Sequence, residues 1–262
     1  MSVPTNLAGG PDAGSIPAVL LVGGMGTRLQ SVLPAKAKPV APLGEITFLE
    51  LLILQLRSQG IRRLVLCTGH RADQIESVCG DGQKWGMTIE YSREAQPLGT
   101  AGALKFAEPL LRESPEFLVT NGDSFLEFEL YEFLRFHRQH RGLVSLASRS
   151  VADASRYGAV EIDEHKRVVR FCEKNNSGAP GVVNGGVYLF QRTALQHFPH
   201  GPSSLEKDIF PRLLNYGVYA AEQSGMFIDI GTPDDYARAQ TLVQTLREAA
   251  QADKPFEAAA RR

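Results

Sequence analysis

The chain has 262 residues, 43% of them hydrophobic, and its 28 basic and 29 acidic residues give a formal net charge of −1. This composition is ordinary for a globular protein, and the balanced charge argues against a nucleic-acid partner held by phosphate neutralisation. The three cysteines form no CxxC pair and no apolar run is long enough to span a bilayer, so we expect a cytoplasmic protein with neither a structural zinc site nor a membrane partner.

The two ends of the chain differ from its middle. Residues 1–15 lack the charged and apolar regions of a secretory signal, and we expect them to form a flexible leader, with residues 251–262 as a tail. Residues 16–250 contain no internal repeat, low-complexity segment or linker. We therefore predict a single domain over 16–250.

The first half of that domain alternates apolar segments with segments of helical periodicity. Strands are predicted at 18–23, 62–69, 87–94 and 116–124, and helices at 47–60, 71–82 and 100–113. Thr47 and Glu50 have the spacing of a capping box for the first helix, which Gly60 ends. This βαβα order predicts an α/β fold, a Rossmann-like three-layer sandwich whose ligands bind at the carboxyl ends of the strands.

The second half has a different pattern, with polar alternation in its strands. We predict strands within 143–150, 158–174, 185–191 and 218–231, and helices at 204–217 and 232–251. The last helix has a candidate N-cap in Thr232 and Pro233 at its first position. The sheet is therefore expected to be mixed but mostly parallel.

A glycine-rich loop follows the first strand. "GGMGTRL" at 23–29 carries three glycines and Arg28, and "AKPVAP" at 37–42 carries Lys38. The loop is not a Walker A motif, and Leu29 replaces the last glycine of GxGxxG, which argues against a nicotinamide-dependent dehydrogenase. The alternative is a tight turn with two solvated cations. We favour a backbone cradle for phosphate in which Arg28 and Lys38 stabilise a phosphoryl group in its transition state.

Two aspartates have the chemistry of magnesium ligands. Asp123, in "NGDS", follows a strand, and Asp229, in "FIDIGTPDDY", lies in an apolar run where an unpaired carboxylate is costly. Taken alone, the first motif is more typical of a turn, and the second of a buried aspartate that pairs with lysine or caps a helix. Asp234 and Asp235 are interpreted as first-turn helix acids without a chemical role.

Further polar groups stand at later strand ends. "FCEK" presents Glu173 and Lys174, and "NGGVYLF" begins with Asn184. Carboxylate and amide groups suit sugar hydroxyls, and lysine suits a sugar phosphate. Each segment alone is typical of an exposed strand end, so a sugar site is inferred only from their coexistence.

Together these motifs resemble the sugar-1-phosphate nucleotidyltransferases over residues 18–239. "GGMGTRL", "KPVAP", "QPLGTAGAL", "NGDS", "YGAV", "FCEK", "NGGVY" and "FIDIGTP" follow in the family's order. The resemblance implies the GT-A-like nucleotidyltransferase fold and a reaction in which a sugar 1-phosphate attacks a nucleoside triphosphate and pyrophosphate leaves. It also implies Mg²⁺ as cofactor.

The resemblance assigns roles residue by residue. Val22, Gly23, Gly24, Gly26, Thr27 and Gly122 would bind the nucleotide, Gln96, Gly99 and Thr100 would contact its base and ribose, and Asp123 and Asp229 would hold Mg²⁺. Arg28, Lys38 and Asp123 would be catalytic, and Lys36 could share the role of Lys38. Gly158, Glu173, Lys174 and Asn184 would bind the sugar phosphate.

Within the family, the motifs are most similar to the small bacterial enzymes that join GTP to D-glycero-α-D-manno-heptose 1-phosphate. N-acetylmuramate 1-phosphate uridylyltransferases and mannose or glucose 1-phosphate nucleotidyltransferases are the alternatives. A catalytically silent nucleotide-sugar sensor is a different class, but such a protein should have lost one of Arg28, Lys38, Asp123 and Asp229, and all four are present. Exposed strand edges would allow a homodimer.

Overall fold

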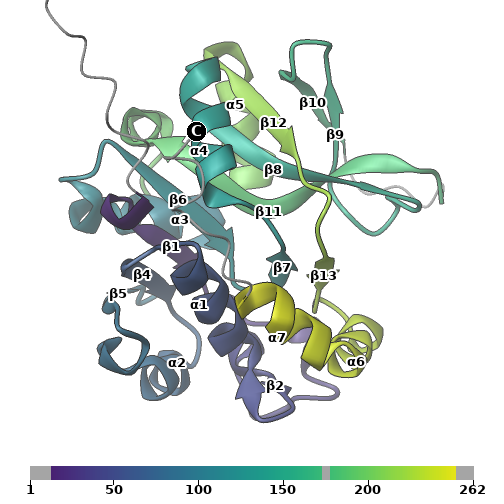
Figure 1. Ribbon diagram of the computed structural model, residues 1–262. Coiled ribbons are helices and arrows are strands. Elements are labelled where there is room, and N and C mark those ends of the chain that lie inside the picture. The colour runs from purple at the N-terminus through teal and green to yellow at the C-terminus, as the bar shows by residue number, and fades with distance from the viewer. Residues whose placement is uncertain (1–12, 173–177, 252–262) are drawn as a thin grey trace, which may run out of the picture.

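The computed structural model describes residues 13–172 and 178–251, which are built around a nine-stranded mixed sheet (Figure 1). Four parallel strands run in the order β5-β4-β1-β6, and β11 adds to β6 in the antiparallel direction. β8 and β12 continue the sheet beyond β11, while the β9–β10 hairpin pairs with the first half of β11. The strands are β1 (Ala18–Leu21), β4 (Arg63–Thr68), β5 (Thr88–Arg93), β6 (Glu116–Asn121), β8 (Val144–Val151), β9 (Ala159–Ile162), β10 (Val168–Cys172), β11 (Gly181–Gln191) and β12 (Val218–Glu222).

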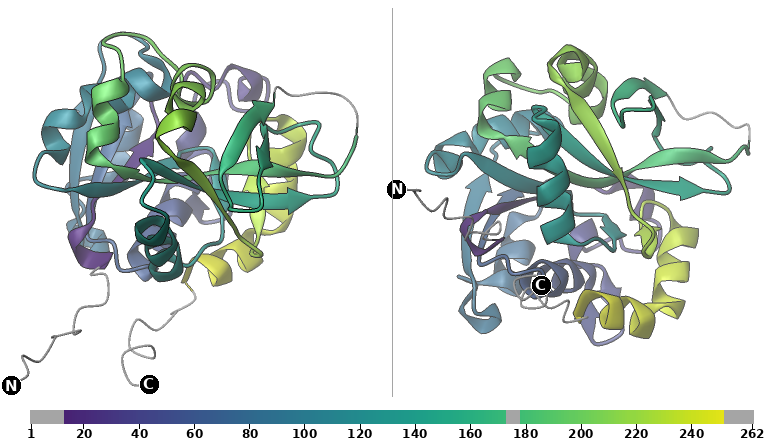
Figure 2. Two further views of the ribbon diagram at one scale, coloured as in Figure 1. Left: turned by 90° about the horizontal axis from the view of Figure 1, so that it is seen from above. Right: turned by 45° about the horizontal axis from the view of Figure 1, so that its top comes forward.

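Helices cover both faces of this sheet. Alternate residues of β1 point to opposite sides, so that Leu20 packs into one buried apolar cluster and Val19 into the other. Side chains of α1, α2, α4, α6 and α7 contribute to the first cluster and those of α3 and α5 to the second, and Figures 1 and 2 show α1 and α7 side by side. The helices are α1 (Phe48–Ser58), α2 (Ala72–Cys79), α3 (Gly99–Phe106), α4 (Leu130–His140), α5 (Phe210–Leu213), α6 (Pro233–Thr241) and α7 (Val243–Gln251).

This arrangement confirms the predicted three-layer α/β sandwich. Two small antiparallel pairs lie outside the main sheet: β2 (Pro42–Leu43) with β3 (Ile46–Thr47), and β7 (Ser124–Leu126) with β13 (Phe227–Asp229). In the described residues, no helix is both apolar and long enough to cross a bilayer. Of the expected leader and tail, only residues 13–15, which form a 3₁₀ turn, and Gln251 lie within the described part.

Short capping motifs in the sequence predicted the starts of helices more accurately than the hydrophobic pattern predicted their lengths. The capping box at Thr47 and Glu50 is present, and Thr232 caps α6 through the N–H of Asp235. The segment predicted as a helix at 204–217 is helical over most of its length, but it consists of a π-helical turn, the short α5 and a 3₁₀ turn. Pro211, within α5, has no N–H to donate to the preceding turn, so regular α-helical bonding cannot run through it. The predicted helix at 232–251 breaks at Leu242.

Two further elements differ from expectation. The strand predicted at 218–231 is two strands, β12 in the main sheet and β13 in the pair with β7. Helix α4 was not predicted, although Leu130, Phe133, Leu134 and His137 form a buried stripe at helical spacing.

His137 makes the stability of the fold sensitive to mild acid. The ring is fully buried, and Ser145 Oγ lies 2.8 Å from Nδ1 and Gln191 Nε2 lies 3.1 Å from Nε2. Burial lowers the pKa of His137 from 6.5 to about 4, so between these values the unfolded chain binds the proton more tightly than the folded one. The contribution of neutral His137 to stability is therefore present in full above pH 6.5 and is lost as the pH falls toward 4.

We expect this one group to lower the free energy of unfolding by about 2 kcal/mol between pH 7 and pH 5. Urea denaturation of the wild type and of His137→Gln at pH 7 and pH 5 measures how much unfolding free energy each protein loses. The loss should be smaller in the variant by the about 2 kcal/mol that His137 contributes. His165→Gln, at an exposed histidine, is the control. Equal pH dependence in the wild type and His137→Gln would contradict the assignment.

Candidate active site

A cavity of about 490 Å³ opens at the carboxyl ends of the parallel strands. Leu21 ends β1, Cys67 lies near the end of β4 and Asn121 ends β6, and all three residues line the cavity. This is the edge that the βαβα pattern predicts for ligands. Of the predicted site residues, those that line the cavity are Val22, Gly23, Gly24, Gly26, Arg28, Lys38, Gly99, Thr100, Gly122, Asp123 and Asp229.

The glycine-rich loop follows β1 directly. Gly26 has φ +59°, and a Cβ at this position would lie 2.8 Å from Lys38 Cβ, so the loop can approach Lys38 only with glycine here. Within the described part of the chain, the backbone N–H groups of Gly24, Met25 and Gly26 form no hydrogen bond and Arg28 forms no ion pair. The loop therefore presents unused N–H donors and a free guanidinium to an anion.

Lys38 bridges the glycine loop and the first aspartate. It begins a 3₁₀ turn whose second residue, Pro39, is buried, and its Nζ lies 2.8 Å from Asp123 Oδ2. Only 13% of the Lys38 side chain is exposed, so the ammonium is held in place. Lys36 is exposed and lies outside the cavity lining, so of these two lysines only Lys38 lines the cavity.

Asp229 meets Asp123 through the β7–β13 pair. Asp229 stands opposite Ser124, and the N–H of Ile230 donates to the carbonyl of Asp123 at 2.9 Å. Burial, followed by the negative charge of Asp123, raises the pKa of Asp229, while Lys38 opposes the shift. The two acids predicted from separate motifs thus lie together beside the glycine loop.

The donor set of this cavity fits a hard divalent cation. Among the described residues, five carboxylates but only three cationic side chains line it, so a triphosphate would enter a site that already has excess negative charge. A cation between Asp123 and Asp229 would relieve both this excess and the repulsion between the two acids. No cluster of three or more His, Cys, Asp or Glu side chains suited to a metal occurs among the described residues, so phosphate oxygens and water would complete the shell, as is usual for Mg²⁺.

The remaining predicted residues lie elsewhere. Thr27 and Gln96 are exposed and do not line the cavity. Asn184 and Gly158 lie just behind the cavity wall, next to Tyr188, which lines the cavity. The N–H of Asn184 donates to the Gly158 carbonyl at 2.9 Å, and Nδ2 of Asn184 donates to the Tyr188 hydroxyl at 2.9 Å. Glu173 and Lys174 lie outside the described residues.

Sequence reasoning missed Glu94, which lines the cavity one residue after β5. Its Oε2 accepts a hydrogen bond from the N–H of Leu98 at 3.2 Å, and burial raises its pKa. A Cβ on Gly23 would come within 3.0 Å of Glu94 Oε1, and one on Gly69 within 2.6 Å. The signal was available, since Glu94 ends the predicted strand 87–94 at the carboxyl edge of the sheet.

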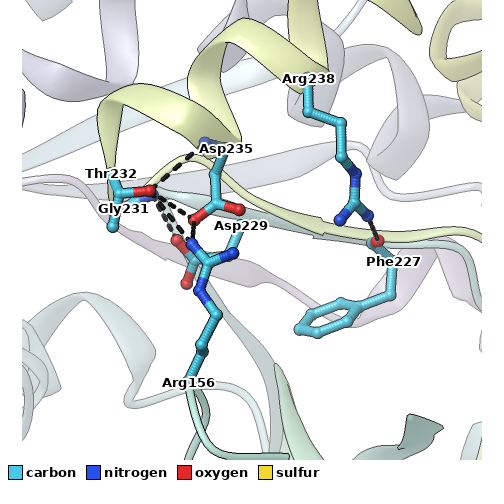
Figure 3. Close-up of polar contacts among 7 residues, drawn as sticks. All are labelled: Arg156, Phe227, Asp229, Gly231, Thr232, Asp235 and Arg238. Carbon is cyan, nitrogen blue, oxygen red and sulfur yellow. Dashed lines mark hydrogen bonds and ion pairs between the residues drawn. The ribbon is translucent and has the colours of Figure 1, made fainter. Parts of the chain in front are cut away.

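Sequence reasoning also missed a polar cluster of Arg156, Thr232 and Asp235, shown in Figure 3. Arg156, in the connection between β8 and β9, forms an ion pair with Asp235 and donates to Thr232 Oγ1 at 3.2 Å. Asp235 is a first-turn helix acid as predicted, but it is also buried and lines the cavity together with Arg156. Its burial could not be read from its position in α6.

Most of this chain matches one known protein family and individual members with related names. Residues 17–245 match the family model described as "Nucleotidyl transferase". The mannose-1-phosphate guanylyltransferase of Mycobacterium tuberculosis is 36% identical over 227 residues, covering 85% of this chain and 63% of that protein. The Drosophila melanogaster mannose-1-phosphate guanylyltransferase catalytic subunit beta is 32% identical, covering 92% and 67%. The chain thus spans about two thirds or less of the length of these curated relatives.

Solved structures match over a larger share of their length. HddC from Yersinia pseudotuberculosis complexed with GMP-PN is 31% identical with a TM-score of 0.78, covering 86% of this chain and 98% of that one. A putative glucose-1-phosphate thymidylyltransferase from Bacillus anthracis, 22% identical with a TM-score of 0.78, shares the fold. On the match of residues 17–245, the chain belongs to the nucleotidyl transferase family.

Proposed function

We propose that this chain transfers a guanylyl group from GTP to a sugar 1-phosphate, forming a GDP-sugar and pyrophosphate. The observation that carries the proposal is the meeting of Asp123, Asp229 and Lys38 beside the unused N–H groups of the glycine loop. This set combines anion donors, a fixed ammonium and two oxygen ligands for a cation. Family membership and the names of the relatives support the same reaction class.

The proposed chemistry is a single in-line displacement. An oxygen of the sugar phosphate bonds to the α-phosphorus while the bond from that phosphorus to the bridging oxygen of the β-phosphate breaks, and pyrophosphate takes the electron pair. The glycine loop and Arg28 hold the β- and γ-phosphates, and Lys38 stabilises charge on the α-phosphate. No nucleophile from the chain is required, so catalysis consists of positioning and charge stabilisation.

Asp123 and Asp229 would hold Mg²⁺ in this scheme. When bound, the ion would supply positive charge to the phosphate oxygens, which the excess of carboxylates in the cavity cannot do. Lys38 orients Asp123 through their 2.8 Å contact, and the N–H of Gly231 orients Asp229.

The carboxylate of Glu94 is the reason to propose guanine as the base of the nucleotide. Guanine presents two adjacent donors, N1–H and the N2 amino group, and a carboxylate accepts from both, whereas adenine has no such pair of donors. Glu94 lines the cavity beside Gly23 of the glycine loop and accepts a hydrogen bond from the N–H of Leu98, which directly precedes Gly99, where the base and ribose are expected. The guanylyltransferase names of the relatives and the GMP-PN in the HddC structure agree with this choice.

The sugar is proposed to have the manno configuration. D-glycero-α-D-manno-heptose 1-phosphate is the first candidate, on the motifs that suggested it from sequence. Mannose 1-phosphate is the second candidate, since the curated relatives carry that name. Tyr188 lines the part of the cavity proposed to face the sugar, Asn184 and Gly158 lie behind it, and Glu173 and Lys174 are proposed to join them.

A matrix of nucleoside triphosphates against sugar 1-phosphates, read by pyrophosphate release, tests this function. We expect turnover with GTP and a manno-configured sugar 1-phosphate, dependent on Mg²⁺ and abolished by EDTA. Preference for UTP with N-acetylmuramate 1-phosphate would replace the proposed substrates. Nucleotide-sugar binding without pyrophosphate release in any combination would identify a silent sensor.

A further inference from the structure

A second cavity, of about 420 Å³, adjoins the first. Among the described residues, Arg156 and Tyr157 line both cavities, so they form the wall between them. The second cavity is otherwise lined by Arg149, Ser150, Val151, Ala152, Asp153, Gly225, Met226, Phe227 and Arg238. None of these other residues lines the first cavity.

The wall is fixed by a few specific contacts. The guanidinium of Arg156 pairs with Asp235, whose Oδ2 also accepts from Thr232 Oγ1 at 2.7 Å (Figure 3). The Tyr157 ring packs against Phe227, with 5.2 Å between ring centroids. Because 47% of the Arg156 side chain is exposed, its ion pair with the buried Asp235, rather than close packing, keeps it in the wall.

The position of this wall relates it to the sugar. Tyr157 precedes Gly158, whose carbonyl accepts from Asn184 at the sugar side of the first cavity. Thr232 and Asp235 follow Asp229 along the chain, and all three line the first cavity with Arg156. A sugar whose phosphate lies near Asp229 and whose ring lies near Tyr188 would share the cavity with Arg156 and Tyr157, which line it too.

We propose that Arg156, held by Asp235, is a specificity-determining residue that limits the size of the sugar. The inference rests on the proposed function and extends it to substrate class. With Arg156 in place, the sugar must fit within the first cavity. Removing its side chain joins the two cavities and makes room for sugar 1-phosphates with a bulky substituent on the ring.

The test compares two sugar 1-phosphates, the best substrate of the matrix and an analogue with a larger ring substituent. In Arg156→Ala, we expect the ratio of kcat/KM for the larger to that for the smaller sugar to rise about tenfold, with the KM for GTP unchanged. Asp235→Asn should also raise this ratio, since it weakens the ion pair with Arg156 but keeps the size of the side chain. Arg156→Lys should keep a ratio near that of the wild type.

Arg138→Ala is the matched control. Arg138 pairs with Glu116, and the exposed fractions of the two side chains, 42% and 8%, are close to the 47% and 8% of Arg156 and Asp235. Neither Arg138 nor Glu116 lines either cavity. This control should lose similar stability without any change in the sugar ratio.

The outcomes separate this inference from the proposed function. A wild-type enzyme with no turnover in the matrix contradicts the function itself. A wild-type enzyme with turnover whose sugar ratio is the same in Arg156→Ala, Asp235→Asn and Arg138→Ala overturns the inference alone. Complete loss of activity in Arg156→Ala with normal GTP binding also overturns it, because Arg156 would then be required for the chemistry.

Discussion

Replacing Asp123 with asparagine is expected to lower kcat by about a thousandfold. The change removes one of the two carboxylates proposed to hold Mg²⁺ and also the partner of Lys38, whose Nζ lies 2.8 Å from Asp123 Oδ2. Asparagine keeps the shape of the side chain, so the loop after β6 should stay in place. Pyrophosphate release with GTP and the best sugar 1-phosphate, measured over a range of Mg²⁺ concentrations, gives the result.

Asp234→Asn is the control for this experiment. Asp234 lies in the first turn of α6, close in sequence to Asp229, but its side chain is exposed and does not line the cavity. We expect this variant to retain wild-type kcat and Mg²⁺ dependence. Wild-type turnover in Asp123→Asn, or turnover of the wild type that EDTA leaves intact, would remove the metal assignment.

Glu94→Gln should change the choice of base. A carboxylate accepts from both guanine donors, whereas glutamine replaces one acceptor with a donor and can instead pair with adenine. We expect the ratio of kcat/KM for GTP to that for ATP to fall about a hundredfold, the scale of a lost bidentate base contact. Competition between the two nucleotides, with both GDP-sugar and ADP-sugar quantified, measures the ratio directly.

The matched control for the base experiment is Glu90→Gln. Glu90 lies on the same strand, β5, but pairs with Arg63 at 2.6 Å and stays outside the cavity. Its nucleotide preference should match that of the wild type. If Glu94→Gln also keeps the wild-type GTP to ATP ratio, Glu94 acts only through its bond to the Leu98 N–H.

Features encoded within a few residues could be predicted from the sequence. The apolar run before the glycines indicated both β1 and the edge of the sheet at which the loop would lie. The capping box at Thr47 and the N-cap at Thr232 were equally local. The irregular helix type around Pro211 could have been predicted by the same means, since proline has no N–H to donate to the preceding turn.

Features that depend on distant partners could not be derived in this way. No spacing rule places Asp229 beside Asp123, and only the family resemblance suggested it. β7 and β13 are three residues each, too short for a clear alternation. Arg156 looks like an ordinary loop arginine until its pairing with Asp235 is seen, and the position of Asp235 in α6 is explained equally well by the helix dipole.

The short β7–β13 ribbon has a consequence for how the enzyme matures. It joins segments separated by about a hundred residues, so its formation must wait until the chain between them is largely in place. β1, which carries the glycine loop, also needs distant partners, but its pairing with β4 and β6 requires the chain only as far as Asn121, whereas the ribbon requires it as far as Asp229. The two acids therefore come together only when the chain has reached Asp229, well after the strands beside the glycine loop are complete, so the acquisition of metal affinity would mark a late stage of assembly.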